Sequence, residues 1–150
     1  MLTSLEHVQI PVKQMDRAIL WYTEQLGFRL SSRDGERIAF LTLPEGPILM
    51  LWQTSDDGTN AHYTVNGTDF PVLLFRTTRL HELYKNLTLL GTPIQLYQND
   101  GFAWVLKFYD TEGNLWGVLQ FNQPDDNEKS TTNNGGKDSS KANSVIDKSK

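Results

Sequence analysis

The sequence predicts an α+β fold built from two paired βαβββ modules. The main observation is an imperfect internal repeat: His7–Gly27 is typical of a short strand followed by an amphipathic helix that ends in glycine, and Val72–Gly91 repeats that order 65 residues later. Each copy then continues through further strand-like segments, to Ile48–Gln53 in the first and Leu115–Gln120 in the second. A repeat constrains the fold before any single motif is considered, because each unit must bury its apolar face against its neighbour.

The elements of the first module follow from the spacing of apolar side chains. Apolar residues at every second position from Val8 to Val12 predict a strand with one apolar face. A helix follows, because apolar residues recur at helical spacing up to Gly27, which can form a left-handed C-terminal cap. Two further strands are predicted at 38–43 and 48–53, separated by a turn that contains two prolines.

The second module is predicted in the same way. Its helix has a buried stripe at helical spacing, formed by Leu80, Leu83, Tyr84, Leu87 and Leu90. The strands that follow are expected at 94–98, 103–109 and 115–121. The turn Asp110–Asn114 precedes the last strand, and its Gly113 and Asn114 are residues that tolerate positive φ.

The chain is expected to form one domain followed by a tail. The domain covers 1–122, with modules at about 4–54 and 70–121 and a polar linker at 55–69 that is longer than most connections. Residues 123–150 contain almost no apolar side chains. They cannot bury enough surface to offset their conformational entropy, so we expect this tail to be disordered.

Composition excludes several classes of function. The chain has no cysteine, which excludes disulfides and thiolate chemistry and fits a reducing, cytoplasmic location. Its start lacks the basic and apolar regions of a signal peptide, and no apolar run is long enough to span a membrane, so no membrane partner is expected. The formal net charge is −4 and no basic stripe is present, which argues against nucleic acid as the main partner.

Four stretches of the chain resemble the vicinal-oxygen-chelate superfamily, which includes glyoxalase I, extradiol dioxygenases, fosfomycin resistance proteins and bleomycin-binding proteins. The stretches are His7–Phe28, Leu49–Gln53, Leu74–Gly91 and Phe108–Phe121. The resemblance implies that the two modules form a cupped mixed sheet around a cavity, and that the protein is a homodimer. It also implies divalent-metal ligands on the opening and last strands of each module, where the metal stabilises a substrate anion as a Lewis acid.

The residues at the implied ligand positions do not suit a hard metal ion. His7 is the expected residue on the first opening strand, but Met50 occupies the position on the strand that closes the first module. On the second opening strand the position falls on Val72, or on Pro71 if the register slips by one, and on the last strand it falls on Gly117. A single imidazole cannot hold a catalytic metal ion, so the sequence predicts no metal and no other cofactor.

An alternative metal site built from His7, His62 and Asp69 is also possible on sequence grounds. It corresponds to the alternative function, a metal-dependent glyoxalase-like lyase or dioxygenase with a non-standard site. A third possibility is a structural or regulatory protein whose cavity is filled by its own side chains.

The leading prediction is a metal-independent protein that binds a small organic molecule. Strand alternation places Met50 and Trp52 on one face, and an aromatic, mostly apolar pocket suits a planar or amphipathic ligand. His7 is the candidate catalytic residue, because it could bind a ligand or act as a general base near neutral pH. The predicted ligand-binding residues are His7, Gln9, Met50, Trp52, Val72, Trp104 and Gly117.

Overall fold

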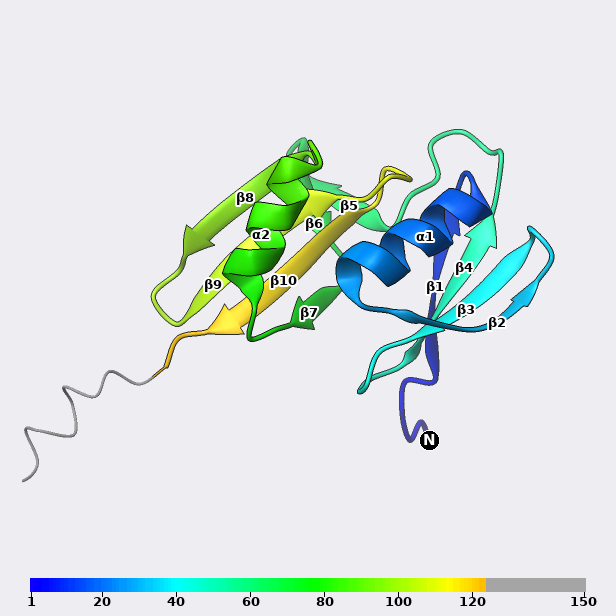
Figure 1. Ribbon diagram of the computed structural model, residues 1–150, viewed down its shortest axis with the longest axis horizontal. Coiled ribbons are helices and arrows are strands. Elements are labelled where there is room, and N and C mark those ends of the chain that lie inside the picture. The colour runs from blue at the N-terminus through cyan, green and yellow to red at the C-terminus, as the bar shows by residue number, and fades with distance from the viewer. Residues whose placement is uncertain (124–150) are drawn as a thin grey trace, which may run out of the picture.

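The computed structural model describes residues 1–123, so the predicted tail at 123–150 lies outside these residues except for its first position. Within this part of the chain the predicted α+β fold of two βαβββ modules is confirmed (Figure 1). The elements are β1 (His7–Val12), α1 (Met15–Leu26), β2 (Arg29–Asp34), β3 (Ile38–Thr42), β4 (Ile48–Gln53), β5 (His62–Val65), β6 (Thr68–Pro71), β7 (Leu74–Arg76), α2 (Leu80–Leu89), β8 (Ile94–Asn99), β9 (Ala103–Tyr109) and β10 (Leu115–Phe121).

Both modules build their sheets in the same strand order. The first sheet has the order β1-β4-β3-β2 and the second has the order β7-β10-β9-β8. In each sheet the opening strand pairs in parallel with the last strand of its module, and the other pairs are antiparallel. The internal repeat of the sequence is therefore a repeat of topology. Figure 1 shows the modules side by side, with α1 and α2 on the same side of the two sheets.

The hydrophobic core is shared between the modules. Helix α1 buries Tyr22 completely, and the ring of Tyr22 lies 5.2 Å from that of Trp116 in β10. The neighbouring Trp21 ring lies 6.0 Å from Phe108 in β9. These contacts join the first helix to the second sheet, so neither module has an independent core.

The ends of both helices are set by glycine. Gly27 follows α1 with φ of 78°, as the sequence predicted, and Gly91 follows α2 with φ of 74°. Leu90 was predicted to be buried but is 56% exposed, because the regular helix ends at Leu89. In the part of the chain that the structure describes, neither helix is long and apolar enough to cross a membrane.

The turn between β9 and β10 caps the first helix. The carboxylate of Glu112 accepts hydrogen bonds of 2.8 Å from the backbone N–H groups of Lys13 and Gln14, and another of 2.8 Å from Nε of Arg17. The side chain of Gln14 does not cap α1. Glu112 instead binds the amides of the two residues before the helix, and Oε1 of Gln53 accepts the amide of Met15, the first helical residue, at 2.9 Å. Burial works to raise the pKa of Glu112, but the bonds from Arg17, the two amides and Thr111 outweigh it and hold that pKa below its ordinary value.

The same turn buries a second carboxylate. Asp110 accepts hydrogen bonds from the hydroxyl of Tyr22, from Nε1 of Trp116 at 3.2 Å, and from the backbone N–H groups of Glu112 and Asn114 at 2.8 Å each. Burial raises the pKa of Asp110, although these hydrogen bonds partly offset the rise. We call Asp110, Glu112 and Asn114 the intermodule clamp, because their partners come from both modules.

Asn114 differs from the prediction. Among the described residues Asn66 is the only non-glycine with positive φ, so Asn114 does not have the conformation that its place in the turn suggested. Its side chain is instead completely buried: Nδ2 donates to the carbonyl of Pro11 at 2.9 Å, and Oδ1 accepts from the amide of Ala61 at 2.9 Å. The residue serves as a hydrogen-bonding link between modules.

The linker between the repeats contains a β-hairpin that the sequence analysis missed. Strands β5 and β6 pair antiparallel and are joined by Asn66 and Gly67, with φ of 50° and 80°. Two successive positive φ values are typical of a type I′ turn, and Asn-Gly is its preferred sequence. This dipeptide was the sequence signal for the hairpin.

Candidate functional site

The candidate site is the face of the first sheet that points away from both helices, which we call the outer face of the first sheet. Its side chains are His7, Gln9, Pro11, Ile38, Phe40, Ile48, Met50 and Trp52. The register pairs Gln9 with Met50 and Pro11 with Trp52, and paired residues project to the same side of a sheet. Leu49 and Leu51 face the helices and are 3% and 0% exposed.

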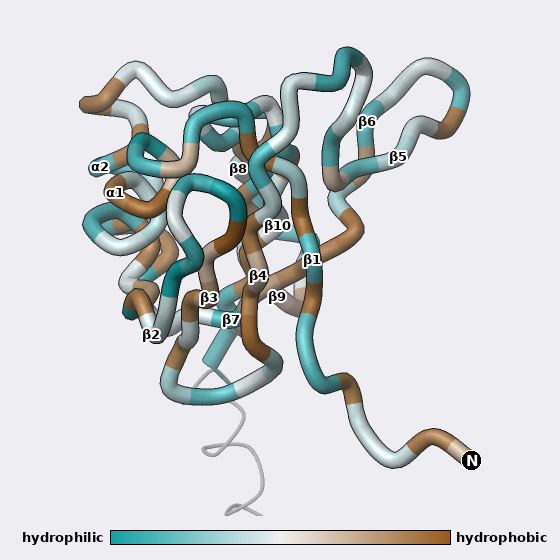
Figure 2. Tube along the Cα trace, turned by 90° about the vertical axis from the view of Figure 1, so that its right-hand side faces the viewer, coloured by the Kyte–Doolittle hydropathy of each residue, from teal (hydrophilic) through white to brown (hydrophobic). Residues whose placement is uncertain are grey.

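This face is apolar along β3 and β4 and polar at its edge on β1. Trp52 is 37% exposed, and the neighbouring Met50 is 8% exposed. On β1, the side-chain amide of Gln9 lies 3.0 Å from Nε2 of His7. The amide donates, so a neutral His7 ring has its hydrogen on Nδ1. Figure 2 shows both helices on one side of the molecule, with β1 and the β5–β6 hairpin on the other.

The corresponding face of the second sheet is covered. The β5–β6 hairpin lies over it: the hydroxyl of Tyr109 donates to Oδ2 of Asp69 at 2.6 Å, and the amide of Gln95 donates to the carbonyl of Asp69 at 3.0 Å. Nζ of Lys107 lies 5.1 Å from the centre of the Phe70 ring. The two modules therefore share a topology, but the hairpin lies over this face only in the second sheet.

His62 and Asp69, two members of the alternative metal site, are brought together by this hairpin. Nε2 of His62 lies 3.6 Å from Oδ2 of Asp69, and Nδ1 of His62 accepts the backbone N–H of Leu115 at 3.3 Å. The hydrogen bond to Asp69, with a smaller contribution from burial, raises the pKa of Tyr109. These contacts hold the hairpin on the second sheet. They also engage both ring nitrogens of His62, which are the atoms that would bind a metal ion.

The residues at the implied metal-ligand positions do not fit a divalent ion. Among residues 1–123 no three His, Cys, Asp or Glu side chains are close enough to hold one, and this excludes a cluster of His7 with His62 and Asp69. Met50 offers a thioether, which does not suit a hard cation. Val72 offers no donor and is 58% exposed in the connection before β7.

Gly117, at the remaining ligand position, lies beneath packed side chains. A Cβ atom built on Gly117 would be 3.1 Å from Cγ of Leu74 and 3.1 Å from Cγ of Pro71. Both distances are shorter than an ordinary van der Waals contact. A side chain here would require Leu74 and Pro71 to shift by a few tenths of an ångström, so the position does not line an open pocket.

We predict that Gly117→Ala lowers the free energy of unfolding by about 1–2 kcal/mol, because the added methyl group overpacks this contact. Urea denaturation measures the change. Since Leu74 is 53% exposed, Leu74→Ala should cost little by itself and should restore part of the lost stability in the Gly117→Ala background. If Gly117→Ala lowered the free energy of unfolding equally in the parent and in the Leu74→Ala variant, the steric explanation would be contradicted.

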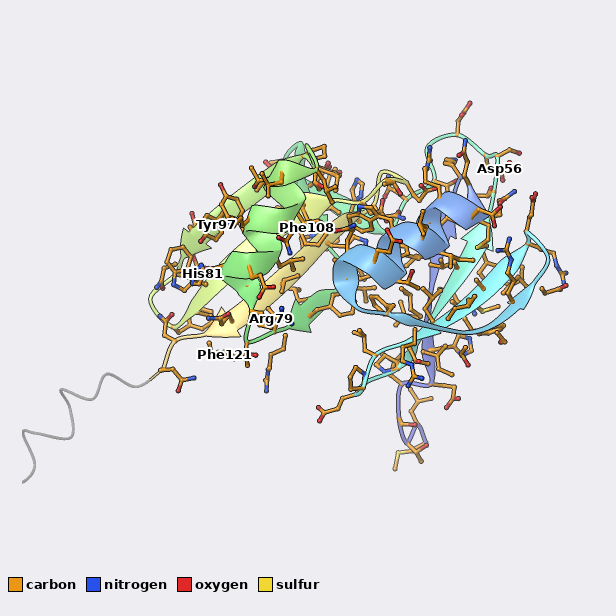
Figure 3. The ribbon with its side chains drawn as sticks, in the orientation of Figure 1. Asp56, Arg79, His81, Tyr97, Phe108 and Phe121 are labelled. Atoms are coloured by element: carbon orange, nitrogen blue, oxygen red, sulfur yellow. The ribbon has the colours of Figure 1, made fainter. Side chains whose placement is uncertain are left out.

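Trp104 was assigned to the predicted pocket, and the structure places it on the opposite side. In β9 it shares the helix-facing side with Leu106 and Phe108, and it packs beside α2 with its ring 4.8 Å from His81 and 5.1 Å from Tyr97. Figure 3 shows His81 and Tyr97 at the end of the molecule that is remote from β1. Trp104 therefore cannot share a pocket with Trp52.

An apolar cavity that the sequence did not predict lies between the modules. Its volume is about 480 Å³, and its lining includes β7 and the β3–β4 connection. None of the seven predicted ligand-binding residues lines it. The protein thus has two apolar features, the outer face of the first sheet and this cavity, and Ile48 at the start of β4 borders both.

Solved structures with the same fold come from several sources. FosX, a genomically encoded fosfomycin resistance protein from Listeria monocytogenes, is 15% identical, with a TM-score of 0.65 over 81% of this chain and 94% of that chain. An integron cassette protein from the mobile metagenome of the Halifax Harbour sewage outfall is 22% identical, with a TM-score of 0.63 over 80% and 100% of the two chains. TnmS3, an antibiotic binding protein from Streptomyces sp. CB03234, is 21% identical, with a TM-score of 0.59 over 81% and 98%.

At these sequence identities the structural matches show the shared fold alone. No curated protein matches the chain in sequence. The family itself is shown by its sequence model, which matches residues 4–118, more than half of the chain and both modules. The β-α-β-β-β order and the strand pairing described above occupy the same residues. The chain therefore belongs to the Glyoxalase/Bleomycin resistance protein/Dioxygenase superfamily.

Proposed function

We propose that this protein binds a small organic molecule on the outer face of its first sheet, without the help of a metal ion. The main observation is the row of apolar side chains that β3 and β4 place on this face, which points away from both helices and ends at Trp52, 37% exposed beside a buried Met50 and a buried Ile38. A face of this kind, with few polar groups at one edge, suits a planar or amphipathic ligand.

Each part of the face has a role in this proposal. Trp52 offers an aromatic surface on which a planar ligand can stack, and the flexible thioether of Met50 adapts to its shape. His7 and Gln9 supply hydrogen bonds at one edge, and their mutual contact orients both side chains. This arrangement binds and orients a ligand but contains no nucleophile or second acid–base group that would support a chemical step.

We further propose that a second copy of the chain closes the site, which would make the protein a homodimer, and that it works in the cytoplasm. Support for the dimer comes from apolar side chains that a monomer leaves in water. Val72 and Leu74 at the opening of the second module and Tyr63 on the hairpin are each more than half exposed. Exposed apolar groups on neighbouring segments are typical of protein interfaces.

The alternative function, a metal-dependent lyase or dioxygenase, lacks support from the donor set. Elemental analysis distinguishes the two functions. A stoichiometric divalent ion that is lost in His7→Ala would contradict metal-independent binding. The absence of bound metal, together with ligand binding in the presence of a chelator, is the expected result.

The binding proposal is tested by thermal-shift screening against small organic molecules, including antibiotics, followed by Trp52→Ala. A ligand at one hundred times its Kd should add about 2.7 kcal/mol to stability. We predict that Trp52→Ala weakens such a ligand by about tenfold or more, because loss of one stacking surface costs at least about 1.4 kcal/mol. Phe102→Ala, which removes an exposed ring from the turn between β8 and β9, is the matched control and should leave affinity unchanged.

A further inference from the structure

We propose that the cavity between the modules is a second binding site, for an uncharged aromatic molecule. The cavity of about 480 Å³ falls in the range of pockets that hold small ligands. The site is independent of the one on the outer face of the first sheet.

The cavity exists because the two modules meet on one side only. Helices α1 and α2 and the intermodule clamp join the modules through a common core. On the opposite side, β1 is an edge strand of the first sheet and β7 is an edge strand of the second, and in residues 1–123 these two strands do not pair with each other. The gap between the two edges is the cavity, so closing it would require the modules to move relative to the clamp.

Both modules contribute apolar walls. Val8 and Leu49 project into the cavity from the helix-facing side of the first sheet, and Leu73 and Phe75 line it from the second module. Phe28, which follows α1, lies between the two walls and is 5% exposed. A ligand would therefore contact both modules and would stabilise their association.

The aromatic groups at the inner end define the ligand class. The rings of Phe28 and Phe75 are 6.1 Å apart and nearly perpendicular, and Phe75 stacks on Trp116 at 4.6 Å. An aromatic ligand can extend this edge-to-face and stacked arrangement.

The polar groups of the cavity argue for a ligand without net charge. Glu45 from the first module and Arg76 from the second supply the only charged side chains of the lining, with opposite signs. All other lining side chains are apolar, and a charged ligand would lose its hydration without a partner deeper in the cavity.

Strand alternation separates this site from the outer face. Val8 faces the cavity while its neighbour Gln9 lies on the outer face, and Leu49 and Met50 alternate in the same way on β4. Each strand thus provides adjacent residues that report on different sites. The two proposals can therefore fail independently.

The test uses N-phenyl-1-naphthylamine, an uncharged aromatic probe, and methyl NMR of the unmodified full-length protein. We expect saturable binding of one probe per chain, with shifts of the Val8, Leu49 and Leu73 methyl resonances and no shift for Met50. Shifts at Met50 without Val8, or no saturable binding up to the solubility of the probe, would overturn the proposal.

A matched pair of variants provides a second readout. Val8→Phe fills the cavity and should weaken probe binding by about tenfold or more. Val65→Phe makes the same substitution at an exposed position of the β5–β6 hairpin, outside the lining, and should leave binding within about twofold. Thermal unfolding checks that both variants fold. If Val8→Phe fails to fold, the NMR map of the parent protein still decides the location.

The N-terminal arm, residues 1–6, is the competing occupant, because Leu5 lines the cavity and Leu2 is fully exposed. Deleting residues 1–4 should leave probe affinity within about twofold of the parent. Probe binding that appears only after this deletion would show that the arm, from the same or a second copy, fills the cavity, and would overturn the proposal.

Discussion

Asp110→Ala is expected to lower the free energy of unfolding by about 3–5 kcal/mol, the largest effect of any substitution considered. The change leaves the hydroxyl of Tyr22, Nε1 of Trp116 and two backbone N–H groups without their acceptor inside the shared core. A buried donor without a partner loses its hydration and gains nothing in return. Urea denaturation at neutral pH measures the loss.

Two companion variants separate the stability lost with the hydrogen bonds of Asp110 from the stability lost with its side-chain volume. Tyr22→Phe removes one donor and keeps the packing, so it should cost less than Asp110→Ala. In the Tyr22→Phe background, Asp110→Ala should cost less stability than in the parent. The reason is that the hydroxyl of Tyr22, one of the donors that Asp110→Ala leaves without an acceptor, is already absent. Additive losses would mean that the hydroxyl of Tyr22 and the carboxylate of Asp110 are not coupled.

The second large effect is expected for Glu112→Ala, at about 2–3 kcal/mol. The variant loses the acceptor of two amides just before α1, those of Lys13 and Gln14, and leaves Arg17 without its carboxylate partner. Glu82→Ala is the matched control, because Glu82 also pairs with an arginine, Arg79, near the start of a helix, but at the exposed surface. That exposed pair is screened by water, so its loss should leave the unfolding midpoint nearly unchanged.

The Glu112 contribution should depend on pH. Its pKa lies below the ordinary value in the folded protein, so the folded state binds fewer protons there than the unfolded chain. The stabilisation is complete above the ordinary pKa of 4.5 and is lost as the pH falls from that value through the folded pKa. The difference in stability between the parent and Glu112→Gln should therefore shrink below about pH 4.5, and a constant difference would contradict the role of the ionised carboxylate.

Most of the fold could be predicted from the sequence because it depends on local periodicity. The alternation of β1, the helical stripe before Gly27 and the repeat of both in the second module are visible in neighbouring residues. The β5–β6 hairpin was missed although Asn66-Gly67 indicated it, because the linker was interpreted from its polar composition. The face of Trp104 was also open to prediction, since the polar Lys107 and Tyr109 alternate with it in β9 and mark the other side.

The candidate site could be predicted only in part. The sequence placed His7, Gln9, Met50 and Trp52 on one face, because side-chain direction in a strand has a period of two. Whether that face is open does not follow from the strand itself. The hairpin lies over the outer face of the second sheet and not over that of the first, and this difference comes from where the hairpin folds.

The sequence by itself determined the βαβββ repeat and the end of the first helix at Gly27. The tertiary structure alone decided the roles of Asp110 and Glu112, whose partners Tyr22 and Arg17 lie 88 and 95 positions away in the chain. It also decided that Gly117 is packed under Pro71 and that a cavity separates β1 from β7. The physical reason is that periodicity and turn preference act between near neighbours, whereas caps, buried carboxylates and gaps between edges depend on segments that meet only after folding.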